Sequence, residues 1–210
     1  MTAVPARLIL YNYDLDPDCY TVRLVASVLR LPLDTVVLDI FPGRDHLTDA
    51  MLTLNPAGRL PVLVDGDLVL TRMPAILWHL ASQPDAALPL IPPNPAAMLE
   101  WLTFAATDLA SASVARAASI MGQGDPVLPR AAARKALRRL DDHMIRQGIH
   151  GHGHVAGPTL TLADLALFAG FALSRDYNVD HDEFPALRLW ARRVRAVRGF
   201  ITMPGIPDYH

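Results

Sequence analysis

The chain has 210 residues, 51% of them hydrophobic and 19% charged, and its formal net charge is −2. This composition is typical of a folded globular protein and excludes a disordered tail. The 21 acidic and 19 basic residues leave no excess of positive charge to attract nucleic acid or anionic lipid. The single cysteine, Cys19, excludes an intrachain disulfide and a thiolate-based metal site. The apolar run of residues 8–11 is too short for a signal peptide, so we predict a cytoplasmic protein without a membrane or nucleic-acid partner.

The N-terminal part alternates short apolar runs with helical periodicity, which is typical of an α/β fold. The predicted order is strand 7–13, helix 18–30, strand 35–40, helix 46–54, hairpin 60–71 and helix 74–82. Within the hairpin, the dipeptide Asp65-Gly66 is typical of a type I′ turn. These elements predict a βαβ unit followed by a ββα unit that share one small sheet.

A proline-rich segment follows, and beyond it every periodic segment is helical. The predicted helices cover residues 98–120, 130–147, 162–173 and 184–197. Residues 162–173 are apolar nearly all round, which predicts a buried central helix. We therefore predict an N-terminal domain over 1–83, a linker over 84–96 and an all-helical domain over 97–210.

Three segments resemble the cytosolic glutathione S-transferase family, in particular its bacterial and theta-like members. Residues 52–71, LTLNPAGRLPVLVDGDLVLT, resemble the family segment N-P-x-G-x-V-P-x-L-x-D-G without a gap. Residues 158–168 resemble the start of the buried helix in the family's second domain, and residues 184–200 resemble its closing helix. The resemblance implies an α/β thioredoxin-like N-terminal domain, βαβ-ββα, followed by an all-α C-terminal domain.

The resemblance also implies a cis peptide bond before Pro61. The backbone N–H and C=O of Leu60 would then pair, as in a strand, with the cysteinyl part of the tripeptide thiol glutathione. This pairing requires no particular side chain. Glutathione is therefore the cofactor that the resemblance implies.

One end of the implied glutathione site is similar to that of theta-like members. Their pattern H-L-S-D-A-F precedes N-P at a fixed spacing, and this chain has HLTDAM from His46 to Met51 before Asn55-Pro56. His46 is thus a candidate contact for the glycine carboxylate of glutathione, and Arg59 could add positive charge. The alternative is that His46 is a solvent-facing residue at a helix start.

The other end departs from the family pattern. The family places Glu or Gln followed by Ser at the start of the third helix, where they hold the γ-glutamyl amine and carboxylate. This chain has Arg72-Met73 instead, and a cation repels an ammonium group. The helix start and the Met73 N–H could still bind an anion, and the Arg72 side chain could itself form an ion pair with a carboxylate. The alternative is that Arg72 points into water and Met73 packs inward.

The residue that activates the thiol is also altered. The family pattern S-x-N-C-Y-K-V-R corresponds to residues 16–23, so Asp16 replaces the serine. An ionised aspartate cannot donate a hydrogen bond to a thiolate and repels it. Three alternatives remain open: a phenol donor from Tyr11 or Tyr13, Asp16 as a general base, or Cys19 as an acidified thiol.

Two further motifs need a structural interpretation. Thr161 and Asp164 have the spacing of a capping box, which predicts a structural role for the buried carboxylate. The tract His150, His152 and His154 could converge on one ion, but it lies in a glycine-containing loop without an evident carboxylate partner. We therefore predict no physiological metal site.

The predicted function is glutathione-dependent addition, substitution or isomerisation of a small electrophile. The alternative is a protein of the same fold that has lost ordinary glutathione use, acting as a binding or regulatory partner or as a glutathione-independent biosynthetic enzyme. The resemblance implies a two-fold homodimer across the first helices of the second domain. The C-terminal segment 201–210 either covers the cleft or trails away from it.

Overall fold

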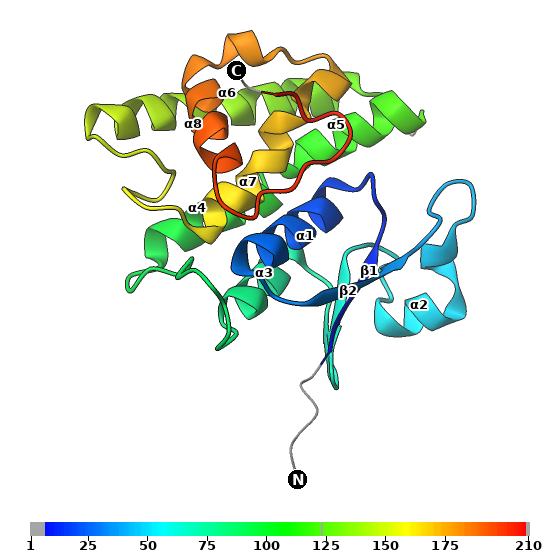
Figure 1. Cartoon of the computed structure of the whole chain (residues 1–210). Helices are drawn as coiled ribbons and strands as arrows, with labels where there is room; N and C mark the ends of the chain where they lie inside the picture. Colours follow the sequence, from blue (N-terminus) through cyan, green and yellow to red (C-terminus); the bar gives the residue numbers. More distant parts are fainter. Residues whose placement is uncertain (1–6, 123, 209–210) are drawn as a thin grey trace.

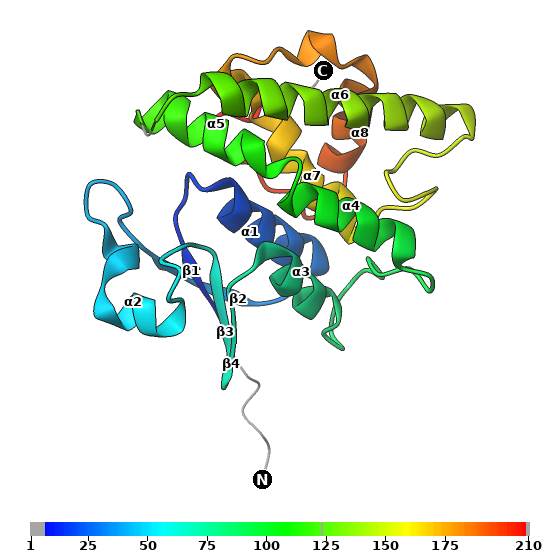
Figure 2. The ribbon, with the colours of Figure 1, turned by 180° about the vertical axis from the view of Figure 1, so that it is seen from behind.

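The computed structural model describes residues 7–122 and 124–208. A small sheet with helices forms the N-terminal part, and a helical bundle packs against it (Figures 1 and 2). The strands are β1 (Leu8–Asn12), β2 (Leu33–Val37), β3 (Val62–Asp65) and β4 (Leu68–Leu70). The helices are α1 (Pro17–Leu29), α2 (Asp49–Leu54), α3 (Met73–Ala81), α4 (Ala96–Ala106), α5 (Ala110–Met121), α6 (Val127–Ile149), α7 (Leu162–Ala172) and α8 (Pro185–Arg195), with short 3-10 turns η1 (Asp45–Leu47), η2 (Ser174–Tyr177) and η3 (His181–Glu183).

The sheet has the strand order β2-β1-β3-β4. Strand β2 runs parallel to β1, whereas β3 is antiparallel to β1 and β4 is antiparallel to β3. The predicted βαβ-ββα order is therefore confirmed. Strand β2 begins earlier than predicted, because all of β1 pairs with it, from Leu8 opposite Leu33 to Asn12 opposite Val37.

The hairpin between β3 and β4 differs from the prediction in its turn. Asp65 is the last residue of β3 and pairs with Leu68, so the loop consists of Gly66 and Asp67. Only Gly66 has a positive φ, of 58°, which is the pattern of a type II′ turn rather than type I′. The side chain of Asp65 is not part of the turn, and its Oδ2 lies 2.7 Å from His79 Nε2 on α3.

Helix α1 lies between the sheet and the helical bundle. It packs against α3 on the sheet side and against α7 in the bundle, as both ribbon views show. The buried face includes Tyr20, Leu24 and Val28, and it forms one continuous core with the inward residues of β1 and of α7. The N-terminus of α1 is therefore held rigidly at the junction of the two parts.

The segment predicted as one helix over 98–120 is two helices, α4 and α5, with a break at residues 107–109. The Thr107 hydroxyl can donate either to the carbonyl of Thr103, at 2.9 Å, or to Asp108 Oδ2, at 3.1 Å, and the Ser111 hydroxyl donates to the carbonyl of Asp108. Such local bonds from short polar side chains compete with the helical ladder. The break turns α5 along the junction, where its residues face the N-terminus of α1.

Helix α7 is the buried central helix that the sequence predicts, since all but one of its residues are buried. The C-terminal segment does not trail into solvent over its described part, 201–208. The Tyr20 hydroxyl of α1 donates to the carbonyl of Ile201, and Met203 is buried against the core. In the described ranges no helix combines the length and the apolar character that crossing a membrane requires.

Candidate functional site

A cavity of about 270 Å³ opens between the N-terminal part and the bundle. Its N-terminal wall consists of the start of α1, the turn before β3 and the start of α3, and its helical wall consists of α4 and α5. The lining residues are Asp18, Arg59, Leu60, Pro61, Thr71, Arg72, Met73, Pro74, Ala105, Ala106, Ala110, Ser113 and Val114. The structure thus brings Arg59, Leu60, Pro61, Arg72 and Met73 together, five residues that the sequence assigns to one ligand site.

The turn before β3 is held by a buried asparagine. Asn55 Nδ2 donates to the carbonyl of Arg59 at 2.7 Å, and Asn55 Oδ1 accepts from the N–H of Ala57 at 3.2 Å. The Leu60-Pro61 peptide bond is cis, as predicted. These bonds place Leu60 and the Arg59 side chain at the cavity.

The start of α3 presents a cation and a buried thioether. Arg72 is the N-cap residue, its side chain makes no capping bond, and it is exposed. Among the described residues, none forms a side-chain hydrogen bond or an ion pair with the Arg72 guanidinium. Met73 packs inward and is buried. The free N–H groups of a helix start and an unpaired guanidinium together favour an anion here.

His46 lies beside the cavity rather than in its wall. His46 belongs to η1, which packs closely on the turn before β3. The contact is so close at Gly58, whose φ is +57°, that a side-chain Cβ there would lie only 2.7 Å from Leu47 Cδ2. His46 is half-buried, and its Nδ1 is buried without a hydrogen-bond partner within the described part of the chain. Because this nitrogen is buried, it is not exposed to the cavity, and the structure does not bring His46 into one wall with Arg59 and Arg72.

A second cavity, of about 140 Å³, adjoins the first, and Ser113 lines both. The lining residues are Tyr13, Leu15, Asp16, Pro17, Ile40, Ser113, Arg116, Ala117, Ile120 and Met121. Together the two cavities reach the size of small-molecule sites, about 300–1,000 Å³. Two of the predicted thiol-activating residues, Tyr13 and Asp16, lie in this second wall.

Asp16 is the N-cap of α1. Its Oδ1 accepts from the N–H of Cys19 at 2.7 Å, which satisfies one of the free donors of the helix start. Burial raises the pKa of Asp16 despite this bond and the nearby Arg116. A carboxyl that retains its proton to higher pH can donate a hydrogen bond, which an ionised aspartate cannot.

The other two candidates lie outside both walls. Cys19 is buried in the core, and burial together with the Asp16 carboxylate raises the pKa of its thiol well above the usual value. This environment disfavours a thiolate nucleophile. Tyr11 follows the inward-facing Leu10 on β1, so its side chain leaves the opposite face of the sheet, away from α1.

Arg116 on α5 is a site residue that sequence reasoning missed. It is 5% exposed, its Nε donates to Asp176 Oδ2 at 2.7 Å, and its Nη1 donates to the carbonyl of Leu15 at 2.5 Å. It thereby ties the bundle to the loop that precedes Asp16. The sequence signal was a lone arginine in an alanine- and serine-rich helix, because such a residue cannot be covered unless it is paired.

The environment of Asp18 predicts an effect of pH on stability. Burial and the Asp16 carboxylate raise the pKa of Asp18 from 3.8 to about 7. The folded state then binds more protons than the unfolded state between these values, so stability falls as the pH rises through this window. We expect Asp18→Asn to match the parent at about pH 3, below the unfolded-state pKa, and to gain about 1 kcal/mol, or about 3 °C in Tm, at about pH 8. Calorimetric melting at both pH values checks this, and a gain that is equal at both would contradict it.

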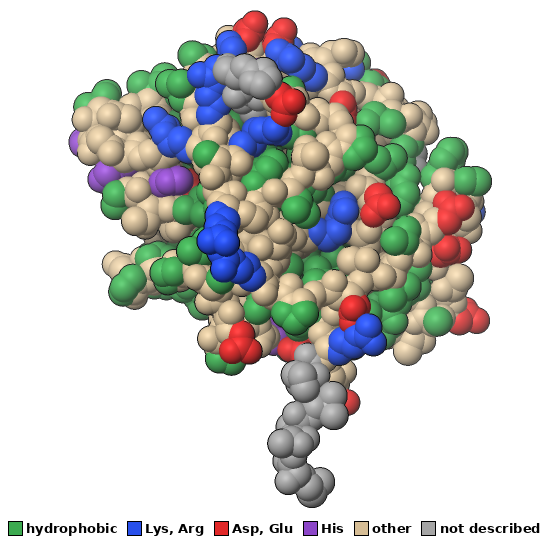
Figure 3. Space-filling view, viewed as in Figure 1, with side chains coloured by type: hydrophobic (Ala, Val, Ile, Leu, Met, Phe, Trp, Pro, Cys, Tyr) green, Lys and Arg blue, Asp and Glu red, His purple; other side chains and the backbone are tan. Residues whose placement is uncertain are grey.

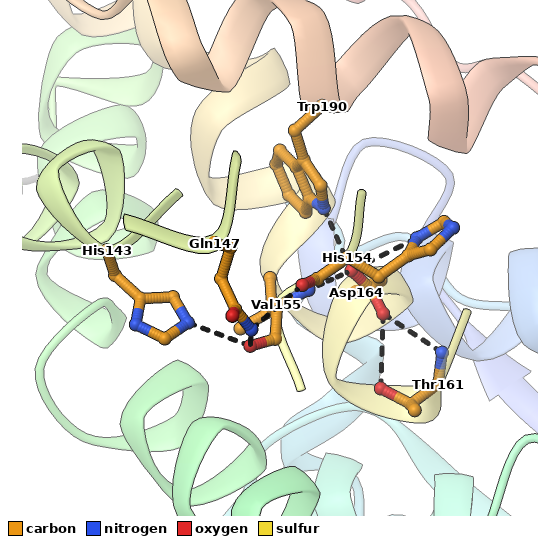
Figure 4. Close-up of polar contacts among 7 residues, drawn as sticks. All are labelled: His143, Gln147, His154, Val155, Thr161, Asp164 and Trp190. Carbon is orange, nitrogen blue, oxygen red and sulfur yellow. Dashed lines mark hydrogen bonds and ion pairs between the residues drawn. The ribbon is translucent and has the colours of Figure 1, made fainter. Parts of the chain in front are cut away.

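The histidine tract is engaged with the buried carboxylate at the start of α7 (Figure 4). His154 Nδ1 lies 3.6 Å from Asp164 Oδ1, so the expectation that no carboxylate lies nearby is wrong. His152 Nδ1 lies 3.1 Å from Gln147 Oε1. The described residues contain no group of three side chains able to hold a metal ion. Histidines also gather at the edge of the face in Figure 3, over the connection between α6 and α7.

Comparison with known proteins assigns the chain to a family. Residues 17–83 match the model described as "Glutathione S-transferase, N-terminal domain". Glutathione S-transferase theta-1 of Bos taurus is 30% identical over 205 residues, covering 90% of this chain and 83% of the relative, and theta-1 of Homo sapiens is 28% identical over 206 residues, covering 90% and 83%. A possible glutathione S-transferase from Rhodopseudomonas palustris superimposes with a TM-score of 0.83 at 27% identity, covering 95% of this chain and 91% of the other. The chain therefore belongs to the glutathione S-transferase family.

Proposed function

We propose that the protein binds glutathione in the first cavity and transfers its thiol to a small electrophile. The observation that carries this proposal is a single cavity wall that combines Leu60, beside the cis bond to Pro61, with two cationic side chains, Arg59 and Arg72. Glutathione carries a carboxylate at each end and a cysteinyl peptide unit between them. Strand-like pairing with Leu60 would hold the middle, and the two guanidinium groups would hold the ends.

The second cavity suits the electrophile. Most of its wall is apolar, including Ile40, Ile120 and Met121, and its polar groups are few. Tyr13 lines it, so a phenol hydroxyl is available to donate to the glutathione sulfur and to stabilise the thiolate. Addition, substitution and isomerisation all begin from that thiolate.

A second candidate function is favoured by Asp16 and Arg72, which replace the family's hydroxyl and its acidic or amide side chain. A protein with these changes could have lost ordinary glutathione use and could serve as a binding or regulatory partner. It could also act on another acidic ligand without glutathione, with Asp16 as the acid–base group. In the first case glutathione would not bind, and in the second the open cavity would accept a different anion.

Calorimetric titration with glutathione at neutral pH separates these functions. We expect saturable binding with a dissociation constant in the micromolar to low-millimolar range, as about 4–8 kcal/mol of binding free energy would give. Arg72→Met should weaken binding about tenfold to a hundredfold, because a charge-assisted hydrogen bond to the carboxylate is lost. Arg192→Met is the matched control, since Arg192 is exposed on α8 away from both cavities.

The double variant Arg72→Glu and Met73→Ser restores the family pattern and provides the opposing outcome. If the parent protein does not bind glutathione and only the double variant does, then the transferase function is wrong. The search would then turn to other acidic ligands or to protein partners.

The homodimer and the cytoplasmic location stay predictions. The exposed apolar side chain of Leu99 on α4, which lines neither cavity, is compatible with the dimer seam that the family resemblance implies. The electrophile itself is a proposal at the level of its class, a small molecule that fits the second cavity.

A further inference from the structure

We propose that Asp18 accepts a hydrogen bond from the ammonium group of the γ-glutamyl residue, on the same wall of the cavity as the Arg72 that holds its carboxylate. This inference rests on the proposed glutathione binding and assigns one contact within it. In this chain the positive and the negative charge of the γ-glutamyl subsite would come from different helices than in the family. The cation stands at the start of α3, where the family has an acidic or amide side chain, and the anion stands in the first turn of α1.

The geometry leaves both charges free for a ligand. Asp18 and Arg72 line the same cavity from α1 and from the start of α3. No ion pair within 4.0 Å joins these two residues or either of them to another residue that the structure describes. The Asp18 carboxylate likewise accepts no hydrogen bond from the described residues. Two opposite charges that face one cavity without meeting are suited to the zwitterionic end of an amino acid.

The charges of the whole wall complement glutathione. Asp18, Arg59 and Arg72 are its charged residues, and the helical wall supplies only Ala105, Ala106, Ala110, Ser113 and Val114. Glutathione has two carboxylates and one ammonium, so every charge on the ligand has one opposite charge in the wall. Asp18 is half-buried, and a partly desolvated carboxylate without a counter-ion is costly, which is a reason to expect that a ligand supplies one.

The electrostatic environment agrees with an ammonium partner. Desolvation, together with repulsion from the Asp16 carboxylate, raises the pKa of Asp18 to about 7. An ammonium group would reverse this effect by stabilising the ionised form. The titratable and charged groups around Asp18 are Asp16 and Cys19 at the start of its own helix, Arg59 and Arg72 in the same cavity wall, and Arg116 near Asp16.

A calorimetric cycle with two ligands and two proteins tests the contact. The ligands are glutathione and γ-glutaryl-cysteinyl-glycine, the analogue in which hydrogen replaces the ammonium group. We expect the parent protein to bind glutathione about tenfold to a hundredfold more tightly than the analogue. Asp18→Asn should bind glutathione more weakly by the same factor and bind both ligands about equally. Asp67→Asn, an exposed acid in the hairpin loop outside the cavity, is the matched control.

The outcomes separate this inference from the function on which it rests. If the parent protein binds neither ligand, the proposed glutathione function fails. If it binds glutathione and Asp18→Asn binds it equally well, the function stands and the Asp18 contact is wrong. Because Asp18→Asn should gain stability at high pH, a melting curve confirms that any loss of binding occurs in a folded protein.

A pH series provides an independent readout. An ammonium contact requires ionised Asp18, so glutathione affinity should rise about tenfold between about pH 5.5 and pH 8 in the parent protein, with protons released on binding. In Asp18→Asn the rise should be lost. A rise of equal size in both proteins would assign the titration to another group and would overturn the inference.

Discussion

Asp164→Ala is expected to destabilise the protein by about 4 kcal/mol, which lowers Tm by about 12 °C in a chain of this size. Asp164 is fully buried at the third position of α7. Its Oδ1 accepts from the N–H of Val155 and from Trp190 Nε1, each at 2.9 Å. Its Oδ2 accepts from the N–H of Thr161 at 2.9 Å and from the Thr161 hydroxyl at 3.1 Å, as Figure 4 shows.

The cost is large because alanine leaves buried donors without partners. Each unsatisfied buried donor costs about 1–3 kcal/mol, and the N–H groups of Val155 and Thr161 and the indole of Trp190 would all lose their acceptor. The same carboxylate joins three separate segments, because its partners Val155, Thr161 and Trp190 lie in the loop after α6, at the start of α7 and in α8. The network extends to α6, since the carbonyl of Val155 lies 2.8 Å from His143 Nε2 and accepts from Gln147 Nε2 at 2.7 Å. The predicted capping box is confirmed, but the structure makes it the centre of a wider network.

Urea denaturation followed by tryptophan fluorescence measures this effect. Asp164→Asn should cost less than alanine, because the amide oxygen still accepts hydrogen bonds. It should still destabilise the protein, because the amide NH₂ would face donors where the second carboxylate oxygen accepted. Asp142→Ala, an exposed neighbour on α6, should change stability by less than about 0.5 kcal/mol. A loss below about 1 kcal/mol for Asp164→Ala would show that the network is dispensable.

Tyr13→Phe is expected to lower kcat/KM for glutathione transfer to chlorodinitrobenzene by about a hundredfold. Removing one hydrogen-bond donor to a developing anion typically costs about 10²–10³ in rate. Tyr13 lines the second cavity beside Asp16, whereas Tyr11 on the same strand lines neither cavity. Tyr11→Phe therefore makes the same chemical change outside the site and should alter the rate less than about twofold.

The pKa of bound glutathione distinguishes activation from a merely structural role. Ultraviolet absorbance of the thiolate, titrated on the protein–glutathione complex, should show a higher thiol pKa in Tyr13→Phe and an unchanged one in Tyr11→Phe. If Tyr13→Phe leaves both the thiol pKa and the rate unchanged, then Tyr13 is not the activating donor.

Asp16→Ser tests the remaining candidate. Serine is as good an N-cap as aspartate, so helix α1 should keep its start and the protein its stability. The variant also restores the hydroxyl donor that the family pattern has, so it should lower the thiol pKa if Asp16 suppresses activation. If Asp16 instead acts as the acid–base group, then the same variant loses activity.

Much of the fold follows from local pattern. Alternating apolar runs and helical periodicity identify the βαβ-ββα order, and an all-round apolar run identifies α7, because burial on every side leaves no polar face. The ungapped segment 52–71 identifies the turn that carries Pro61. These features depend on residues close together in the chain, so a single sequence contains them.

The candidate site is only partly of this kind. Arg59, Leu60 and Arg72 lie in recognisable segments, and the cavity confirms that they converge. Asp18 carries no local signal, because it lines the cavity only when α1 packs beside the start of α3. The lone Arg116 in α5 marks a residue that must be paired, but its partners Asp176 and Leu15 are distant in sequence. The break between α4 and α5 was missed for a different reason, because the alanine-rich segments on either side favour a continuous helix.

The sequence by itself determined the family, the order of the elements and the two segments, 59–61 and 72–73, that line the first cavity, because these rest on periodicity and contiguous motifs. Only the tertiary structure decided that Cys19 is buried, that Tyr13 rather than Tyr11 lines a cavity, and that Asp18 lines the same cavity as Arg59 and Arg72. The physical reason is that exposure, desolvation and charge pairing are properties of packed neighbours. They arise when α1, α3 and α5 meet, and no short stretch of sequence contains all three.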